Sequence, residues 1–153
     1  HPMPYGDLAR ERVQRFASRA DLEAAGCTIE EREEYEPWVA AGAVIFAGVD
    51  YAAILAAAES GADVLVWDGG NNDFPFLCPD LHLVLVDALR PDQLTTHHPG
   101  EAVLRMADVV VVTKTDVAPD ADVQRLAAAA RAIRPSARVV RTRVYAEPYG
   151  SQP

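Results

Sequence analysis

Short apolar runs alternate with helical segments over most of this chain, and this alternation restricts the fold more than any other feature. The runs are AVIFAGV over 43–49, DVLVWD over 63–68, LHLVLVD over 81–87, DVVVVT over 108–113 and ARVVRTRV over 137–144. Continuous apolar runs of this length, bounded by turn residues, are typical of buried strands. Strands that alternate with helices form parallel sheets. We therefore predict an α/β fold, a three-layer parallel sheet with helices on both faces.

Helix signals occupy the N-terminal region and the spaces between the apolar runs. In residues 7–25, Leu8, Val13, Phe16 and Ala20 fall on one face, which predicts an amphipathic helix. Thr28 and Glu31 have the spacing of a capping box. The other predicted helices run over 29–40, with a break or kink at Pro37, then 50–61, 101–106 and 119–134.

Length and composition favour one soluble domain. The chain has 153 residues, of which 50% are hydrophobic and 24% charged, enough to bury a core. We assign one partial domain to residues 1–144, with a helical region over 7–40 and a strand and helix core over 43–144. Residues 145–153 are predicted to be a disordered tail. No apolar run approaches the roughly 20 residues that span a bilayer, and no secretory signal is visible, so we expect a cytoplasmic protein.

The formal net charge of −9 disfavours nucleic acid and anionic membranes as partners. A locally basic pocket could still bind an anionic phosphorylated small molecule, and Arg90 is the arginine best placed for it, just past a predicted strand end. Cys27 and Cys78 match no metal-binding spacing and are interpreted as reduced thiols.

The richest strand end is the sequence DGGNND over 68–73, and ligands of open parallel sheets bind at the carboxyl ends of strands. Asp68 is placed as the aspartate of a Walker B element, which holds Mg²⁺ directly or through water. Glycine permits close approach of the backbone to a phosphate. The candidates for phosphate, nucleophile or substrate contact are Gly69, Gly70, Asn71, Asn72 and Asp73. The alternative is an ordinary strand-ending turn, since these residues also favour turns.

A second informative strand end is TKTD over 113–116, which has the T-K-x-D form of a guanine-reading motif. Asp116 would accept hydrogen bonds from a guanine base, Lys114 would lay its stem along the base plane, and Thr113 ends the strand. The motif follows the Walker B candidate by about 45 residues and precedes a helix. This order predicts a nucleotide-binding domain.

Lys114 is the single lysine of the chain, so no Walker A loop of the form G-x-x-x-x-G-K-[ST] is present in it. The sequence begins at His1 rather than methionine. We expect this chain to be a piece of a longer protein, with the phosphate-binding loop upstream of His1, and we expect the isolated chain to bind nucleotide poorly.

Three more side chains are candidates for the site. Asp50 follows the first predicted strand and is a candidate metal ligand together with Asp68. His98, in the sequence TTHHPGE, is a candidate for catalysis or substrate contact. For His97 and His98 the alternatives are a metal site with Glu101 and a plain surface loop.

Several stretches resemble the cyclic 2,3-diphosphoglycerate synthetase family of archaea and bacteria, from His1 to about Val144. They are HPMPYGDL, AGVDYAAIL, WDGGNNDFPF, DLHLVLVDALRP, HHPGE and RMADVVVVTKTD. The resemblance implies a P-loop NTPase, similar to metallochaperone GTPases, that closes 2,3-diphosphoglycerate into a ring through a phosphoanhydride with ATP and Mg²⁺. It implies Asp68 at the metal, Gly69 and Gly70 at the γ-phosphate, Lys114 and Asp116 at the base, and His98 and arginines at the substrate.

Three functions follow as hypotheses. The first is part of an ATP-dependent, cyclic 2,3-diphosphoglycerate synthetase-like ligase whose isolated chain is inactive. The second is a GTPase of metallochaperone type. The third is a non-catalytic module that is completed by a P-loop-bearing segment. The sequence leaves ATP versus GTP and homo-oligomer formation open.

Overall fold

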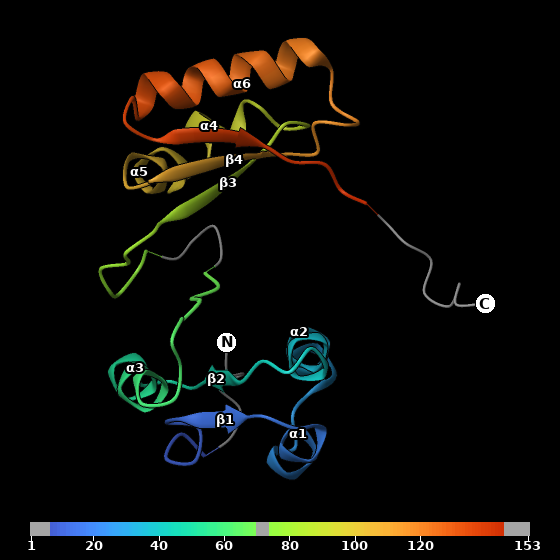
Figure 1. Cartoon of the computed structure of the whole chain (residues 1–153), viewed down its shortest axis with the longest axis vertical. Coiled ribbons are helices and arrows are strands. Elements are labelled where there is room, and N and C mark those ends of the chain that lie inside the picture. The colour runs from blue at the N-terminus through green and yellow to red at the C-terminus, as the bar shows by residue number, and fades with distance from the viewer. Residues whose placement is uncertain (1–6, 70–73, 146–153) are drawn as a thin grey trace, which may run out of the picture. The chain divides into compact units, whose positions relative to one another are not determined.

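The computed structural model describes residues 7–69 and 74–145, and these fall into two compact units, His1–Trp67 and Asp68–Pro153. Figure 1 shows the elements of both units. The predicted single domain over residues 1–144 and the tail over 145–153 remain predictions, and the tail from residue 146 lies outside the described residues.

The first unit is built from a short antiparallel strand pair and three helices. Phe16 pairs with Ile45 across the two strands. Its core contains Phe16, Leu22, Tyr35 and Ala47, with the rings of Phe16 and Tyr35 stacked at a centroid distance of 5.4 Å. The elements are β1 (Gln14–Phe16), α1 (Arg19–Ala25), α2 (Ile29–Ala40), β2 (Ile45–Ala47) and α3 (Tyr51–Glu59).

Local sequence signals explain where these helices begin. Thr28 and Glu31 form the predicted capping box at the start of α2, so the helix over 29–40 is confirmed. Pro37 lies inside α2 and does not end it. Asp50 caps α3 as expected, by accepting a hydrogen bond from the N–H of Ala53.

The predicted helix over residues 7–25 is wrong in its first half. Ser18 caps α1 in a second capping box, so the helix starts only at Arg19, and residues 14–16 pair with β2 instead. The pairing continues beyond the strands, where the N–H groups of residues 49 and 50 donate to the carbonyls of residues 11 and 12. Gly48 permits this contact, because a Cβ there would lie 2.4 Å from the Arg12 carbonyl oxygen.

The second unit contains a three-stranded parallel sheet in the order β3-β4-β5, flanked by helices (Figure 1). Its elements are β3 (Leu83–Asp87), α4 (Gln93–Thr96), α5 (Gly100–Arg105), β4 (Val109–Thr113), α6 (Asp120–Ile133) and β5 (Arg138–Arg141). These strands and the helices α5 and α6 match predicted segments. The α/β class is therefore confirmed.

The core of the second unit lies where helix α6 packs on the central strand. Val110 and Val112 alternate along β4 and are fully buried, and Leu126 of α6 is buried beside them in the same cluster. Leu104 of α5 completes this apolar contact. The four valines that end at Thr113 therefore form a rigid support for the loop that follows.

Two of the five predicted parallel strands are not found in that sheet. Residues 43–49 supply β2, whose partner β1 is antiparallel. Residues 63–68 form no strand, and Val64 and Val66 are 77% and 87% exposed. An apolar run becomes a strand only when a neighbour satisfies its backbone groups, and no segment of the described residues pairs with this one.

Among the described helices, none is both long enough and apolar enough to cross a membrane.

Candidate functional site

The carboxyl ends of the three parallel strands meet at one edge of the second unit. Asp87, the last residue of β3, is paired with Thr113, the last residue of β4. Val112 is paired with Arg141, the last residue of β5. The predicted exits after β3, β4 and β5 therefore lie side by side, as parallel strands require.

The central contact at this edge joins Lys114 to Asp87. The Nζ atom of Lys114 lies 2.7 Å from Oδ2 of Asp87, and Oδ1 of the same carboxylate accepts a hydrogen bond from the N–H of Leu89 at 3.0 Å. The Lys114 ammonium holds the pKa of Asp87 below its ordinary value, against the opposing effect of desolvation. Asp87 is consequently ionised at neutral pH.

The backbone at Lys114 forms a sharp corner. Its φ angle is +59°, in the left-handed region that non-glycine residues rarely adopt. Its carbonyl accepts hydrogen bonds from the N–H groups of Val117 and Ala118, which turns the chain toward α6. A strained corner of this kind is a common feature of ligand sites, where the surrounding structure maintains it.

Thr115 attaches the loop to the exit of β5. Its N–H and its hydroxyl both donate to the carbonyl of Thr142, at 3.2 and 2.9 Å. On the other side, the hydroxyl of Thr113 donates to the Val86 carbonyl at 3.2 Å. The loop between β4 and α6 is thus fixed to both neighbouring strands.

Asp116 projects from this fixed loop. It is exposed and has no hydrogen-bond or ion-pair partner within the described parts of the chain. Its two oxygens can accept hydrogen bonds from a ligand, which a base with adjacent N–H donors would provide. The aliphatic stem of the nearby Lys114 offers apolar surface for the flat face of such a base.

Arg90 lies in the loop after β3 and is exposed. Its N–H donates to the Asp87 carbonyl at 3.0 Å, and its charge also helps to lower the pKa of Asp87. Arg90 is therefore brought to the same edge as Lys114.

The predicted metal ligands have different surroundings. Asp68 is exposed and lies outside any strand, as does Gly69. Asp50 belongs to the first unit, where Oδ1 caps α3 and Oδ2 accepts from Nε of Arg12 at 3.0 Å. Among the residues described, no group of three or more His, Cys, Asp or Glu side chains could hold a metal ion.

These described residues do not by themselves fit a Mg²⁺ site, and the metal roles of Asp50 and Asp68 remain predictions. Gly70, Asn71, Asn72 and Asp73 lie outside the described residues.

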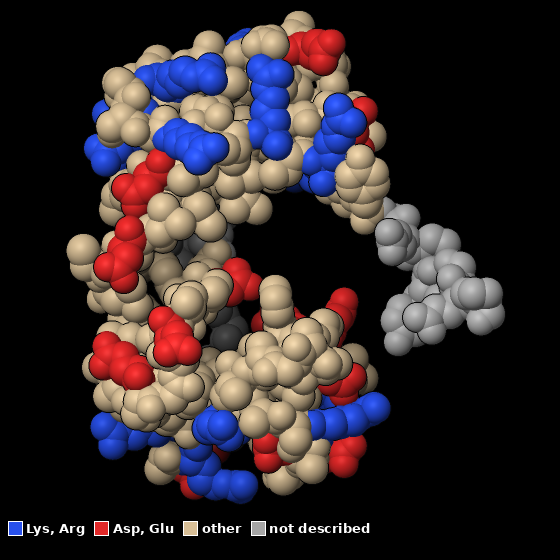
Figure 2. Space-filling view, viewed as in Figure 1, with Lys and Arg blue, Asp and Glu red and all other residues tan. Residues whose placement is uncertain are grey.

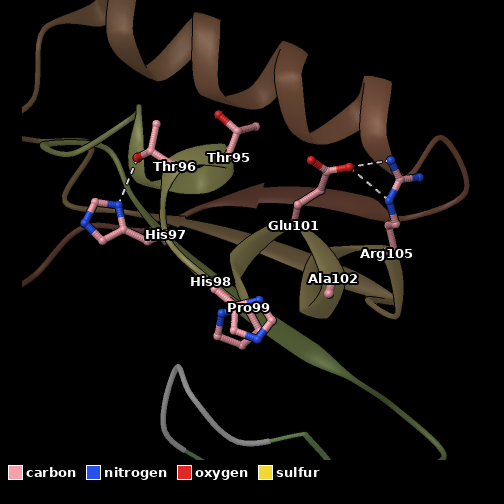
Figure 3. A pocket seen from close by; sticks show the side chains of 8 residues that line it. All are labelled: Thr95, Thr96, His97, His98, Pro99, Glu101, Ala102 and Arg105. Atoms are coloured by element: carbon pink, nitrogen blue, oxygen red, sulfur yellow. Dashed lines mark hydrogen bonds and ion pairs between the residues drawn. The ribbon is translucent and has the colours of Figure 1, made fainter.

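His98 lines an open depression of about 450 Å³ between α4 and α5 (Figure 3). The imidazoles of His97 and His98 point to different sides of it, and Nδ1 of His97 lies 2.9 Å from the Thr96 hydroxyl. Glu101 is paired with Arg105 rather than with either histidine. The ring of His98 lies against Phe74, with a centroid distance of 6.4 Å. The catalytic role of His98 stays a prediction.

The acidic balance of the chain comes mainly from the first unit. Residues 1–67 contain 12 acidic and 5 basic side chains, whereas residues 68–153 contain 11 and 9. Figure 2 shows Lys and Arg side chains gathered over α6 and β5 in the second unit. The second unit is therefore close to neutral, with a formal charge of 9 − 11 = −2.

Sequence reasoning placed Thr113, Lys114, Asp116 and Arg90 at this edge but missed Asp87 as a site residue. The signal for it was present, because Asp87 ends a predicted strand just as Thr113 ends the next one. Thr142 was also missed, since its contribution is a backbone carbonyl that no motif reveals.

Comparisons with known proteins identify the family of this chain. The sequence profile of the family described as "Cyclic 2,3-diphosphoglycerate synthetase, P-loop domain" matches residues 37–143. Arginine synthetase ArcE of Thermococcus kodakarensis is 51% identical over 140 residues, which cover 92% of this chain and 31% of that protein. The chain thus spans about a third of the length of this curated relative. The chain belongs to the family of the cyclic 2,3-diphosphoglycerate synthetase P-loop domain.

Proposed function

We propose that this chain supplies the base-binding edge of the nucleotide site in a nucleoside-triphosphate-dependent ligase. The observation that carries the proposal is the loop over 113–116, which is fixed to β3 and β5 and presents an Asp116 carboxylate without a partner in the described structure. Membership of a synthetase P-loop family supports the ligase class.

Each residue of the loop has a distinct part in the proposed site. The Asp116 carboxylate accepts hydrogen bonds from the edge of the base, and the Lys114 stem contacts its face. Guanine offers two adjacent donors to a carboxylate, whereas adenine offers one donor beside an acceptor. The loop therefore supports GTP, while the resemblance to the synthetase family supports ATP, and both belong in the test.

The phosphates and the reacting group would lie toward the other strand ends. Arg90 lies in the loop after β3 and has no ion-pair partner among the described residues, so it suits an anionic group. In the proposed enzyme the phosphate-binding loop comes from another segment. Asp68 remains the predicted Mg²⁺ ligand of this chain. Catalysis in such a site consists mainly of alignment and charge neutralisation.

Two substrates have specific support. The relative that is 51% identical to this chain is named an arginine synthetase, which favours formation of arginine. By general chemistry, a ligase can form arginine from citrulline and ammonia by activating the ureido oxygen as a leaving group. The family description instead favours ring closure of 2,3-diphosphoglycerate. The first reaction forms a cationic product and the second a polyanionic product. An experiment that measures both products therefore distinguishes the two reactions.

The experiment uses the longest natural protein that contains this chain, with ATP or GTP and Mg²⁺. One arm adds citrulline and ammonium and measures arginine by chromatography, and the other adds 2,3-diphosphoglycerate and follows cyclic product by phosphorus NMR. Nucleotide-dependent product in either arm supports the ligase proposal and identifies the substrate. Nucleotide hydrolysis without product in both arms would contradict it and favour the GTPase alternative.

A separate result would favour a non-catalytic module. If the folded protein bound neither ATP nor GTP at millimolar concentration, the base-binding role of the 113–116 loop would be wrong. Asp116→Ala provides the specificity control, because binding through this loop must weaken when its free carboxylate is removed.

A further inference from the structure

Asp87 has a role that neither the motif nor the family description assigns. Its carboxylate is fixed on both oxygens, by Lys114 at 2.7 Å and by the Leu89 N–H at 3.0 Å. We infer that Asp87 is a positioning residue that holds the Lys114 side chain in place for the nucleotide base. This inference rests on the proposed nucleotide-binding function of the 113–116 loop.

The position of Asp87 is set by the sheet rather than by a flexible segment. It is the last residue of β3 and is paired in register with Thr113, so it lies beside the start of the loop. The left-handed backbone of Lys114 fixes the start of its side chain, and the contact with Asp87 fixes the ammonium group at the other end. Both ends of the lysine are thereby constrained while the stem between them stays accessible, since the side chain is 44% exposed.

This pair differs from an ordinary surface ion pair in the same unit. Arg125 and Asp92 approach to 3.3 Å, but the Asp92 side chain is 79% exposed, whereas that of Asp87 is 25% exposed. Asp87 also receives a backbone hydrogen bond, which further restricts its carboxylate. Asp92→Asn is therefore a matched control that removes a carboxylate from a more exposed ion pair of the same unit.

The pairing also defines what Lys114 contributes. Because a carboxylate holds its ammonium group, Lys114 presents mainly an ordered aliphatic surface. The entropic cost of ordering this side chain is therefore not added when the base binds. Loss of Asp87 should therefore weaken the binding of a nucleoside and of its triphosphate by the same factor. If Asp87 only kept the lysine away from phosphates, its loss would instead strengthen binding of the triphosphate.

The test measures dissociation constants by titration of the longest natural protein that contains this chain with GTP, ATP, guanosine and adenosine. We expect Asp87→Asn to weaken the binding of the preferred nucleotide and of its nucleoside equally, by about tenfold. This change corresponds to about 1.4 kcal/mol of binding free energy. Asp92→Asn should change either constant by less than about twofold. The amide spectrum of each variant checks that the fold is retained.

The background variant Lys114→Ala separates positioning from a general structural effect. In that background Asp87→Asn should have almost no further effect, because no lysine stem remains to be placed. An equal loss in both backgrounds, or unchanged affinity in Asp87→Asn, would overturn the inference while leaving nucleotide binding intact. Absence of binding by the unaltered protein would overturn the proposed function itself, and the role of Asp87 with it.

Discussion

The ammonium group of Lys114 lies 2.7 Å from the carboxylate of Asp87, although the two residues are 27 positions apart in the sequence. The contact joins the ends of two adjacent parallel strands and fixes the lysine of the TKTD sequence to a residue outside that sequence. The candidate site is therefore a property of the sheet edge and not of the TKTD loop alone.

The first prediction concerns the titration of Asp87. Its pKa is held below the ordinary value of about 3.9 by Lys114, so the pair contributes stability that is complete above that ordinary value and is lost as the pH falls through the lower folded pKa. Carboxyl NMR should locate this low midpoint, and Lys114→Met should raise it. An unchanged midpoint in the variant would mean that the lysine contact does not persist in solution.

The second prediction concerns Tyr35 in the first unit. Burial raises the pKa of Tyr35 to about 12, so the folded state keeps the phenol neutral. This contribution to stability is present below the ordinary pKa of about 10 and is lost as the pH rises toward about 12. Phenolate absorbance should give the midpoint.

Two variants check the assignment to Tyr35. Tyr35→Phe keeps the ring that stacks on Phe16 and should reduce the loss of stability between pH 10 and 12, as measured by denaturant unfolding. Tyr51→Phe, which changes an exposed tyrosine of the same unit, is the control and should leave the alkaline loss in place. Equal curves for Tyr35→Phe and the unaltered chain would contradict the assignment.

The third prediction tests the corrected fold of the first unit. Gly48→Ala would place a Cβ 2.4 Å from the Arg12 carbonyl oxygen in a backbone with φ of +155°, so it should destabilise the unit by about 3 kcal/mol or more. Gly42→Ala has open space around it and meets only the unfavourable φ of +87°, with an expected loss of about 1 kcal/mol. Equal losses in denaturant unfolding would argue against the close contact.

Sequence patterns predicted most of the second unit because its signals are local. Four consecutive valines ending in Thr113, a proline at the start of α6 and a long alanine-rich segment each specify their own element. The class of the fold and the loop over 113–116 followed from these signals.

The first unit was harder to predict, because strand pairing depends on residues far apart. Residues 14–16 fit an amphipathic helix pattern, yet they pair with residues 45–47, and only Ser18 marks the true helix start. The apolar run over 63–68 has the composition of a strand, but a strand also needs a neighbour, which composition does not reveal. Asp87 was recognisable as a strand end, but its contact with Lys114 was not, since that contact is set by sheet register.

The fourth prediction concerns base recognition. Asp116→Ala should weaken the binding of GTP by about tenfold and that of ATP by less, because guanine loses two hydrogen bonds to the carboxylate. Asp120→Ala, which removes an exposed carboxylate in the first turn of α6, is the control and should leave both affinities within about twofold. Calorimetry or NMR titration provides the constants. Equal effects of the two variants would exclude a specific contact of Asp116 with the base.

The most direct test of the proposed base-binding edge is a map of amide chemical-shift changes when nucleotide is added to the longest natural protein that contains this chain. We predict that the largest changes occur at residues 113–118, Asp87 and Thr142, which the structure brings to one edge of the sheet. Smaller changes are expected at the depression lined by His97 and His98. The proposed base-binding edge would be contradicted if a saturating nucleotide left residues 113–118 unchanged, or shifted only residues around that depression.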